Sequence, residues 1–85
     1  MNAAREKRLR RLRHRSWRRG MREADLLLGP FADAALEELD DALLSAYERL
    51  LEEDDWDIYY WVSGALEVPH EHAPLIERLR LFHKA

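Results

Sequence analysis

The best candidates for a chemical role in this sequence are Arg19, Gly20 and Glu23, because of their residue types and their spacing. Arg19 offers a planar fork of N–H donors that fits a carboxylate or a phosphate. Glu23 places an acceptor of opposite charge four residues later, and Gly20 permits a turn with positive φ or the close approach of another backbone. The group could therefore hold a polar surface through both signs of charge. The structural alternative is a glycine at a helix end beside an exposed Arg19–Glu23 pair, which would contribute little stability.

A second candidate is the histidine pair near the C-terminal part of the chain. His70 and His72 flank Glu71, and two imidazoles so close together could share a metal ion. No further ligands follow at a recognisable metal-binding spacing. We therefore expect surface histidines and no metal site.

Aromatic residues gather in the second half of the sequence, and their rings could stack on a flavin. Such residues more often fill the core of a small helical protein. Trp56 is the member that we expect to be exposed, because it falls in the first turn of a predicted helix. The cluster consists of Tyr47, Trp56, Tyr59, Tyr60 and Trp61.

Composition excludes several classes of protein. The chain has 85 residues and no cysteine, so it has no disulfide, thiol nucleophile or cysteine-ligated zinc. No apolar run reaches the roughly 18 residues of a membrane span, so we expect no membrane insertion. No paired base and nucleophile can be located, and we predict that the protein is not an enzyme.

Helical periodicity dominates the sequence, and no segment alternates long enough to form a strand. We predict an all-α fold, a compact bundle of about five short helices in one domain spanning residues 1–85. A basic first helix, residues 3–18, has only a thin apolar stripe of Leu9, Leu12 and Trp17, and its start is expected to fray.

The remaining helices have clearer signals. The second begins near Met21 and brings residues 26–28 into the core, with a kink or stop at residues 29–30. The third spans 41–53 behind an Asp40 cap, with Leu39 and Leu44 as a hydrophobic staple. Asp55 is the expected cap of the fourth, which ends at Gly64, and the last starts near residue 72 or 73.

Charge is divided sharply along the chain. Residues 1–23 contain ten Arg or Lys and two acidic residues, whereas residues 24–85 contain four basic and fifteen acidic ones. The protein must therefore present opposite fields on two faces, or fold the basic segment onto its own acidic body.

Two segments of the sequence resemble a known family. The first contains the signature RGxxE and is made of Arg18, Arg19, Gly20, Met21, Arg22, Glu23, Asp25 and Leu26. The second, an acidic turn leading into a helix with a Trp, contains Leu50, Leu51, Glu52, Asp54, Asp55, Asp57 and Trp61. Together they resemble the small assembly factors that promote covalent FAD attachment to the flavoprotein subunit of succinate dehydrogenase. The resemblance covers roughly residues 8 to 82.

This resemblance implies a five-helix protein that binds the flavoprotein subunit, or that of the related fumarate reductase, and favours its autocatalytic flavinylation. The FAD would belong to the client, and the unbound helper would be a monomer. By similarity, the partner-binding residues are Arg18, Arg19, Gly20, Met21 and Glu23, with Asp54, Asp55 and Trp61 as further contacts.

The arginine-rich segment supports an alternative of another class. Clustered arginines around Trp17 are typical of an RNA-binding or regulatory module, although the acidic remainder would repel a polyanion. The same segment is Arg-rich and poor in acid, as an organellar transit peptide is, but cleavage would fall near Gly20. We therefore expect mature sequence and a bacterial cytoplasmic protein.

Overall fold

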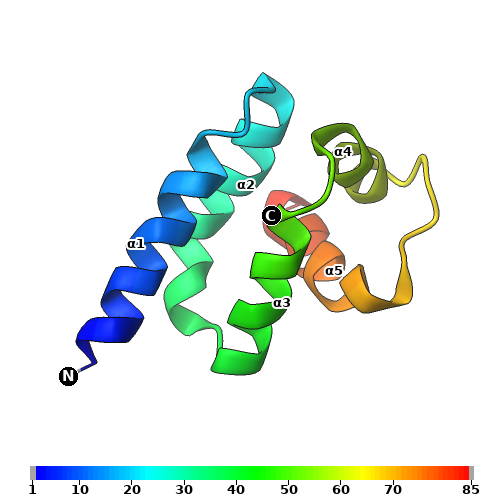
Figure 1. Cartoon of the computed structure of the whole chain (residues 1–85). Helices are drawn as coiled ribbons and strands as arrows, with labels where there is room; N and C mark the ends of the chain where they lie inside the picture. Colours follow the sequence, from blue (N-terminus) through cyan, green and yellow to red (C-terminus); the bar gives the residue numbers. More distant parts are fainter. Residues whose placement is uncertain (1, 85) are drawn as a thin grey trace.

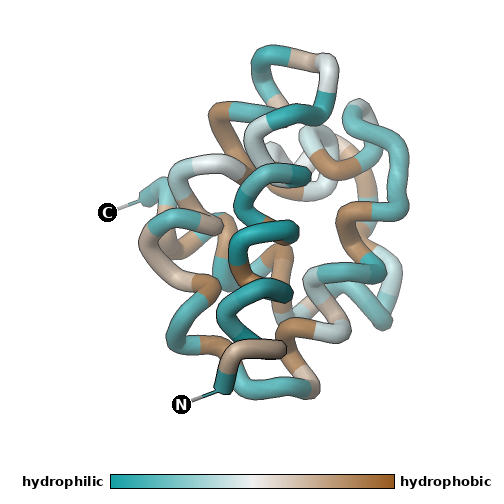
Figure 2. The backbone as a smooth tube through the Cα atoms, turned by 60° about the vertical axis from the view of Figure 1, so that its left-hand side comes forward, coloured by the Kyte–Doolittle hydropathy of each residue, from teal (hydrophilic) through white to brown (hydrophobic). Residues whose placement is uncertain are grey.

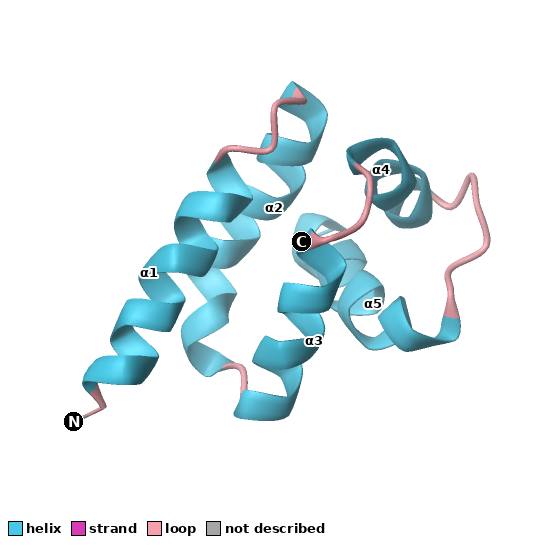
Figure 3. Ribbon diagram, viewed as in Figure 1, coloured by secondary structure: helices cyan, strands magenta, loops and turns pink. Residues whose placement is uncertain are grey.

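The computed structural model describes residues 2–84 and confirms an all-α bundle of five helices (Figure 1). The α-helices are α1 (Ala3–Trp17), α2 (Arg22–Ala35), α3 (Asp41–Leu51), α4 (Asp55–Ser63) and α5 (Ala73–Lys84). Two short 3-10 helices, η1 (Leu36–Glu38) and η2 (His70–His72), precede α3 and α5. Within residues 2–84 no strand occurs, as Figure 3 shows. The predicted domain 1–85 extends one residue beyond the described part at each end.

Helices α1 and α2 run antiparallel along one side, and α5 packs against α2, α3 and α4 (Figure 1). The core is one continuous cluster of apolar side chains contributed by all five helices. Tyr47 of α3 is fully buried in it, and its hydroxyl lies 2.7 Å from that of buried Ser16 in α1. Burial raises the pKa of Tyr47 to about 12, although the Ser16 hydrogen bond opposes this shift.

Helix α1 has the predicted thin apolar stripe, since Leu9 and Leu12 are buried. Most of the other residues along this helix are hydrophilic (Figure 2). Asn2 caps its start by accepting a 3.0 Å hydrogen bond from the Arg5 amide. Fraying of this start stays a prediction. Trp17 is 41% exposed and lies across Gly29 of α2, where any β-carbon would collide with the indole.

The basic segment folds onto the acidic body, one of the two arrangements allowed by the charge division. Within residues 2–84, four ion pairs join α1 to α3 and to Glu52, the residue that follows it. They are Arg5–Asp41 at 3.2 Å, Arg8–Asp41 at 3.9 Å, Arg8–Glu48 at 2.7 Å and Arg15–Glu52 at 2.7 Å. The Arg8 hydrogen bond also lowers the pKa of the Glu48 carboxyl. These contacts orient α1 despite its small apolar face.

Helix α2 differs from the prediction at two points. Of the predicted kink or stop at residues 29–30, the stop is absent, because α2 continues through Pro30 to Ala35. The Leu27 carbonyl lies 2.7 Å from His83 Nε2, and this hydrogen bond joins α2 to α5. Leu28 is buried as predicted, but Leu26 is 51% exposed, because three consecutive leucines cannot share one helix face.

The caps of α3 and α4 were predicted with mixed success. Asp40 accepts a 2.8 Å hydrogen bond from the Leu43 amide, which confirms the first cap, although α3 ends at Leu51 and not near residue 53. The prediction of Asp55 as the second cap was wrong, because Asp54 accepts from the Trp56 amide at 2.9 Å and Asp55 is inside the helix. Gly64 ends α4 with φ 89°, as expected.

None of the helices within residues 2–84 combines the length and apolar character that crossing a membrane requires.

Candidate functional site

The loop between α1 and α2 forms an exposed corner of the molecule, which we call the Gly20 corner and define as Arg18, Gly20, Met21, Arg22 and Glu23. Arg18, Gly20, Arg22 and Glu23 are exposed, and Met21 is half-buried. Gly20 has φ 90°, and a β-carbon built on it would meet no atom within 4 Å. Glycine is therefore needed for the backbone conformation and not for internal packing, and the space above it is open to an outside group.

Arg19 points inward from this corner and joins the α1–α2 loop to the turn between α3 and α4. Its side chain is 11% exposed. The guanidinium donates from Nε to Asp55 Oδ1 at 2.8 Å, from Nη1 to the Leu51 carbonyl at 2.6 Å and from Nη2 to the Glu53 carbonyl at 2.9 Å. The Leu51 carbonyl is among those that a helix end leaves without a helical partner, so Arg19 caps α3.

These bonds revise the prediction for Arg19. It pairs with Asp55 and not with Glu23, and its main-chain N–H donates to Asp25 Oδ1 at 2.7 Å. No side-chain hydrogen bond or ion pair joins Glu23 to another residue within 2–84. The motif therefore divides into an internal arginine and an external set of residues.

The structure brings the two motif segments together through Asp55 but separates their roles. Asp55, whose side chain is 19% exposed, holds Arg19. Asp54 is exposed and caps α4. Trp61 is only 7% exposed, and its ring lies 5.3 Å from the ring of His72, so it contributes to the core and offers little surface to a partner.

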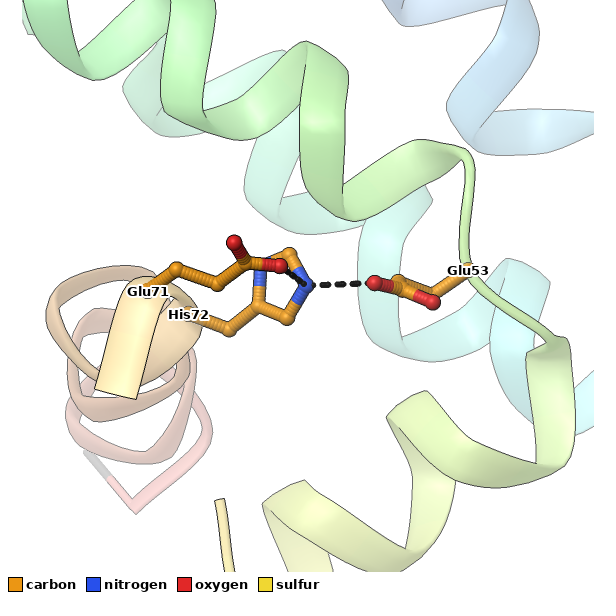
Figure 4. Close-up of side chains that lie close together, drawn as sticks. All are labelled: Glu53, Glu71 and His72. Atoms are coloured by element: carbon orange, nitrogen blue, oxygen red, sulfur yellow. Dashed lines mark hydrogen bonds and ion pairs between the residues drawn. The ribbon is translucent and has the colours of Figure 1, made fainter. Parts of the chain in front are cut away.

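His72 is the clearest correction among the candidate ligands, because it is buried and not a surface histidine. Its Nε2 lies 2.7 Å from Glu53 Oε2 and 3.2 Å from Glu71 Oε1, as Figure 4 shows. The donor atoms of these three residues all lie within 4.8 Å of one another, which makes them the group that a divalent ion could join. The Glu53 hydrogen bond already gives the imidazole nitrogen a partner.

The aromatic residues of α4 divide between core and surface. Trp56 is 52% exposed, as expected from its first-turn position, and it stacks on Tyr60 with ring centroids 5.7 Å apart. Tyr59 meets both rings at a steep angle. Binding of FAD by these rings stays untested.

Sequence reasoning missed Asp25, Glu53 and His72 as supports of the corner. Asp25 binds the Arg19 amide, and Glu53 accepts from Arg19 with its carbonyl and from His72 with its carboxylate. A signal exists only for Asp25, which belongs to the first motif segment. The role of Glu53 depends largely on a main-chain carbonyl, which no sequence pattern marks.

Fold and site together define a small helical protein with an exposed loop at Gly20 and a mostly buried arginine beneath it. The family model described as "Flavinator of succinate dehydrogenase" matches residues 10–83, and the chain belongs to this family.

Curated relatives agree with this assignment. A Schizosaccharomyces pombe protein named "Succinate dehydrogenase assembly factor 2, mitochondrial" is 46% identical over 63 residues, which cover 74% of this chain and 45% of the relative. "Succinate dehydrogenase assembly factor 2-B, mitochondrial" of Drosophila mojavensis is 39% identical over 80 residues, covering 92% of this chain and 51% of the relative. The chain thus spans about half the length of these relatives. The comparisons give no support to the RNA-binding alternative.

The prediction of a bacterial cytoplasmic protein is contradicted by these relatives, which are named as mitochondrial proteins from fungi and a fly. That prediction depended on interpreting the arginine-rich segment as mature sequence and not as a transit peptide. Mature sequence does not separate the bacterial cytoplasm from the mitochondrial interior, because a mature mitochondrial protein has lost its transit peptide.

Proposed function

We propose that this chain binds the flavoprotein subunit of succinate dehydrogenase through the Gly20 corner and promotes covalent attachment of FAD to that subunit. The family description and the names of the relatives support the client and the process. The observation that carries the binding site is the open space above Gly20, whose positive φ no packing inside the molecule requires.

In this proposal the protein supplies no catalytic group and carries no cofactor of its own. A flavinylating subunit must bring a histidine and the flavin into near-attack geometry and stabilise the charge that develops on the flavin ring. A helper that binds the ordered form of the subunit more tightly shifts the population toward it, and about 3 kcal/mol of differential binding changes the ratio more than a hundredfold.

Each part of the motif then has a physical role. Gly20 lets the client backbone approach closely, while Arg18, Met21 and Glu23 provide donor, apolar and acceptor contacts around it. Arg19 gives the corner its shape. Asp55 supports Arg19, and Asp54 lies on the surface as a secondary contact. Trp61 contributes by packing in the core and not by contact with the client.

The second glycine with positive φ supplies a matched control for the test. Gly64 has φ 89° and is exposed, and a β-carbon added to it would also meet no atom within 4 Å. Gly20→Ala and Gly64→Ala therefore carry the same conformational cost, about 1 kcal/mol in the free protein. They differ only in location.

The experiment incubates purified, unflavinylated flavoprotein subunit with FAD and each variant, and measures flavin fluorescence of the denatured subunit. We expect Gly64→Ala to act like the unmodified protein and Gly20→Ala to slow flavinylation by about tenfold, the effect of roughly 1.4 kcal/mol in binding. Equal rates for both variants would remove Gly20 from the contact surface. Flavinylation that does not respond to the unmodified protein at all would refute the proposed function.

The range of clients and the state of the free protein need separate measurements. We propose that the flavoprotein of fumarate reductase is a second client and that the unbound helper is a monomer. The same assay with the fumarate reductase subunit tests the first statement. Light scattering across a concentration series tests the second, and a mass that doubles with concentration would contradict it.

A further inference from the structure

His72 is a buried polar residue that the proposed contact surface does not use. It ends η2, immediately before α5, and is 2% exposed. One face of its ring lies near Trp61, with centroids 5.3 Å apart. Its Nε2 is directed at Glu53 across the gap between η2 and the α3–α4 turn (Figure 4). A buried imidazole with a carboxylate partner is a fixed connection between two elements.

Glu53 connects this histidine to Arg19 beneath the Gly20 corner, because its carboxylate and its main-chain carbonyl each accept a hydrogen bond. The carboxylate lies 2.7 Å from His72 Nε2, and the main-chain carbonyl accepts from Arg19 Nη2 at 2.9 Å. Its side chain is 36% exposed, so without His72 it would turn into solvent. Holding the carboxylate therefore restricts the backbone rotation that aims the carbonyl at Arg19.

We propose that His72 is a positioning residue for the Gly20 corner, acting through Glu53 on Arg19. Its effect on partner binding rests on the proposed function, but its effect on Arg19 exists in the free protein. The path runs from η2 to the α3–α4 turn and then to the α1–α2 loop, and each step is a hydrogen bond of 2.7 or 2.9 Å. His72 lies outside both motif segments and is hydrogen-bonded to no residue of the corner.

The test compares His72→Leu with His70→Leu, since His70 is an exposed histidine in the same 3-10 helix. His72→Gln is the conservative variant, because its amide can still donate to Glu53. The readout in the free protein is hydrogen exchange of the Arg19 Nη2 protons, which donate to the Glu53 carbonyl, followed by NMR. Affinity for the flavoprotein subunit is measured on the same variants.

We expect His72→Leu to accelerate exchange of the Arg19 Nη2 protons about tenfold, the effect of losing one hydrogen bond from a charged group. His72→Gln should restore part of this protection, and His70→Leu should change nothing. In the complex, His72→Leu should weaken binding by a similar factor. Arg19→Lys should remove that effect, so the two changes should not be additive.

Two results would overturn the proposal. If His72→Leu lowers the melting temperature but leaves Arg19 exchange and partner affinity unchanged, His72 is only a core residue. If His72→Leu does not fold, Glu53→Ala replaces it, because this variant removes the carboxylate and keeps the carbonyl; unchanged Arg19 exchange there contradicts the path equally. Failure of the unmodified protein to bind the subunit would refute the proposed function, while Arg19 exchange would still decide the role of His72.

Discussion

Replacing Arg19 with lysine separates a supporting role of this arginine from a contacting one. The guanidinium reaches three acceptors that belong to different residues: Asp55, Leu51 and Glu53. Lysine keeps the charge but has a compact ammonium on a flexible stem, which cannot match a planar fork. We expect it to keep the ion pair with Asp55 and to lose the two bonds to main-chain carbonyls.

The loss can be estimated from these contacts. A hydrogen bond from a charged donor contributes about 1.5 kcal/mol or more, and the fork is mostly buried, so two lost bonds cost about 3 kcal/mol. A domain of this size has a total stability of about 5–10 kcal/mol. Arg19→Lys should therefore lower the melting temperature by about 10–20 °C at the usual few degrees per kcal/mol.

Urea unfolding followed by far-UV circular dichroism, with no partner present, measures this effect. Arg18→Lys is the matched control, because Arg18 is the adjacent residue and is exposed. Its stability should stay within about 0.5 kcal/mol of the unmodified protein. If Arg19→Lys also stays within that range, the fork contributes nothing and the assignment of Arg19 as an internal support is wrong.

Three further predictions concern the packing around α1 and α3. Gly29→Ala should destabilise the protein by displacing the indole of Trp17, seen as a change in tryptophan fluorescence; in a Trp17→Ala background the same change should instead stabilise α2 by about 1 kcal/mol. Since the pKa of Tyr47 is raised to about 12, the stability that its protonated hydroxyl contributes is fully present below pH 10 and is lost between pH 10 and 12, by roughly 2–3 kcal/mol. Melting temperatures measured across this pH range should fall less for Tyr47→Phe than for the unmodified protein. Since Arg8 lowers the pKa of Glu48, the stability that this carboxylate contributes above its ordinary pKa should decline on acidification, and acid titration of Glu48→Gln should show a smaller decline.

Local signals in the sequence were enough to predict most of the fold. Helical periodicity and the Asp40 cap defined α3, and a proline in the first turn marked α5. These features depend on residues a few positions apart, where helix geometry alone decides which groups meet. The number and order of the helices followed from them.

The errors arose where a distant element decided between local alternatives. Asp54 and Asp55 are both suitable caps, and Asp55 is occupied by Arg19 from a loop 36 residues away. Leu26 belongs to an apolar run, but α1 and α5 cover other sides of α2. No sequence pattern states which side of a helix its neighbours will cover.

The candidate site shows the same division. Its residues were found through the RGxxE spacing, and the structure places Gly20 and Glu23 on the surface as expected. The inward direction of Arg19 could not be predicted, because two of its acceptors are main-chain carbonyls that any residue type provides. His72 was misjudged for a similar reason, since only tertiary packing encloses it.

An open glycine and an enclosed arginine in adjacent positions have complementary physical roles. No packing contact at Gly20 stabilises the φ of 90° there, so other interactions must hold the loop in this conformation. The hydrogen bonds of the Arg19 guanidinium do so. A loop fixed before binding loses less conformational entropy when a partner arrives, and the affinity rises accordingly. Substitutions at either position should therefore weaken the same complex for different reasons. Arg19 variants lose stability in the free protein. A Gly20 variant carries the same backbone strain as its Gly64 counterpart and, in addition, loses contact with the partner.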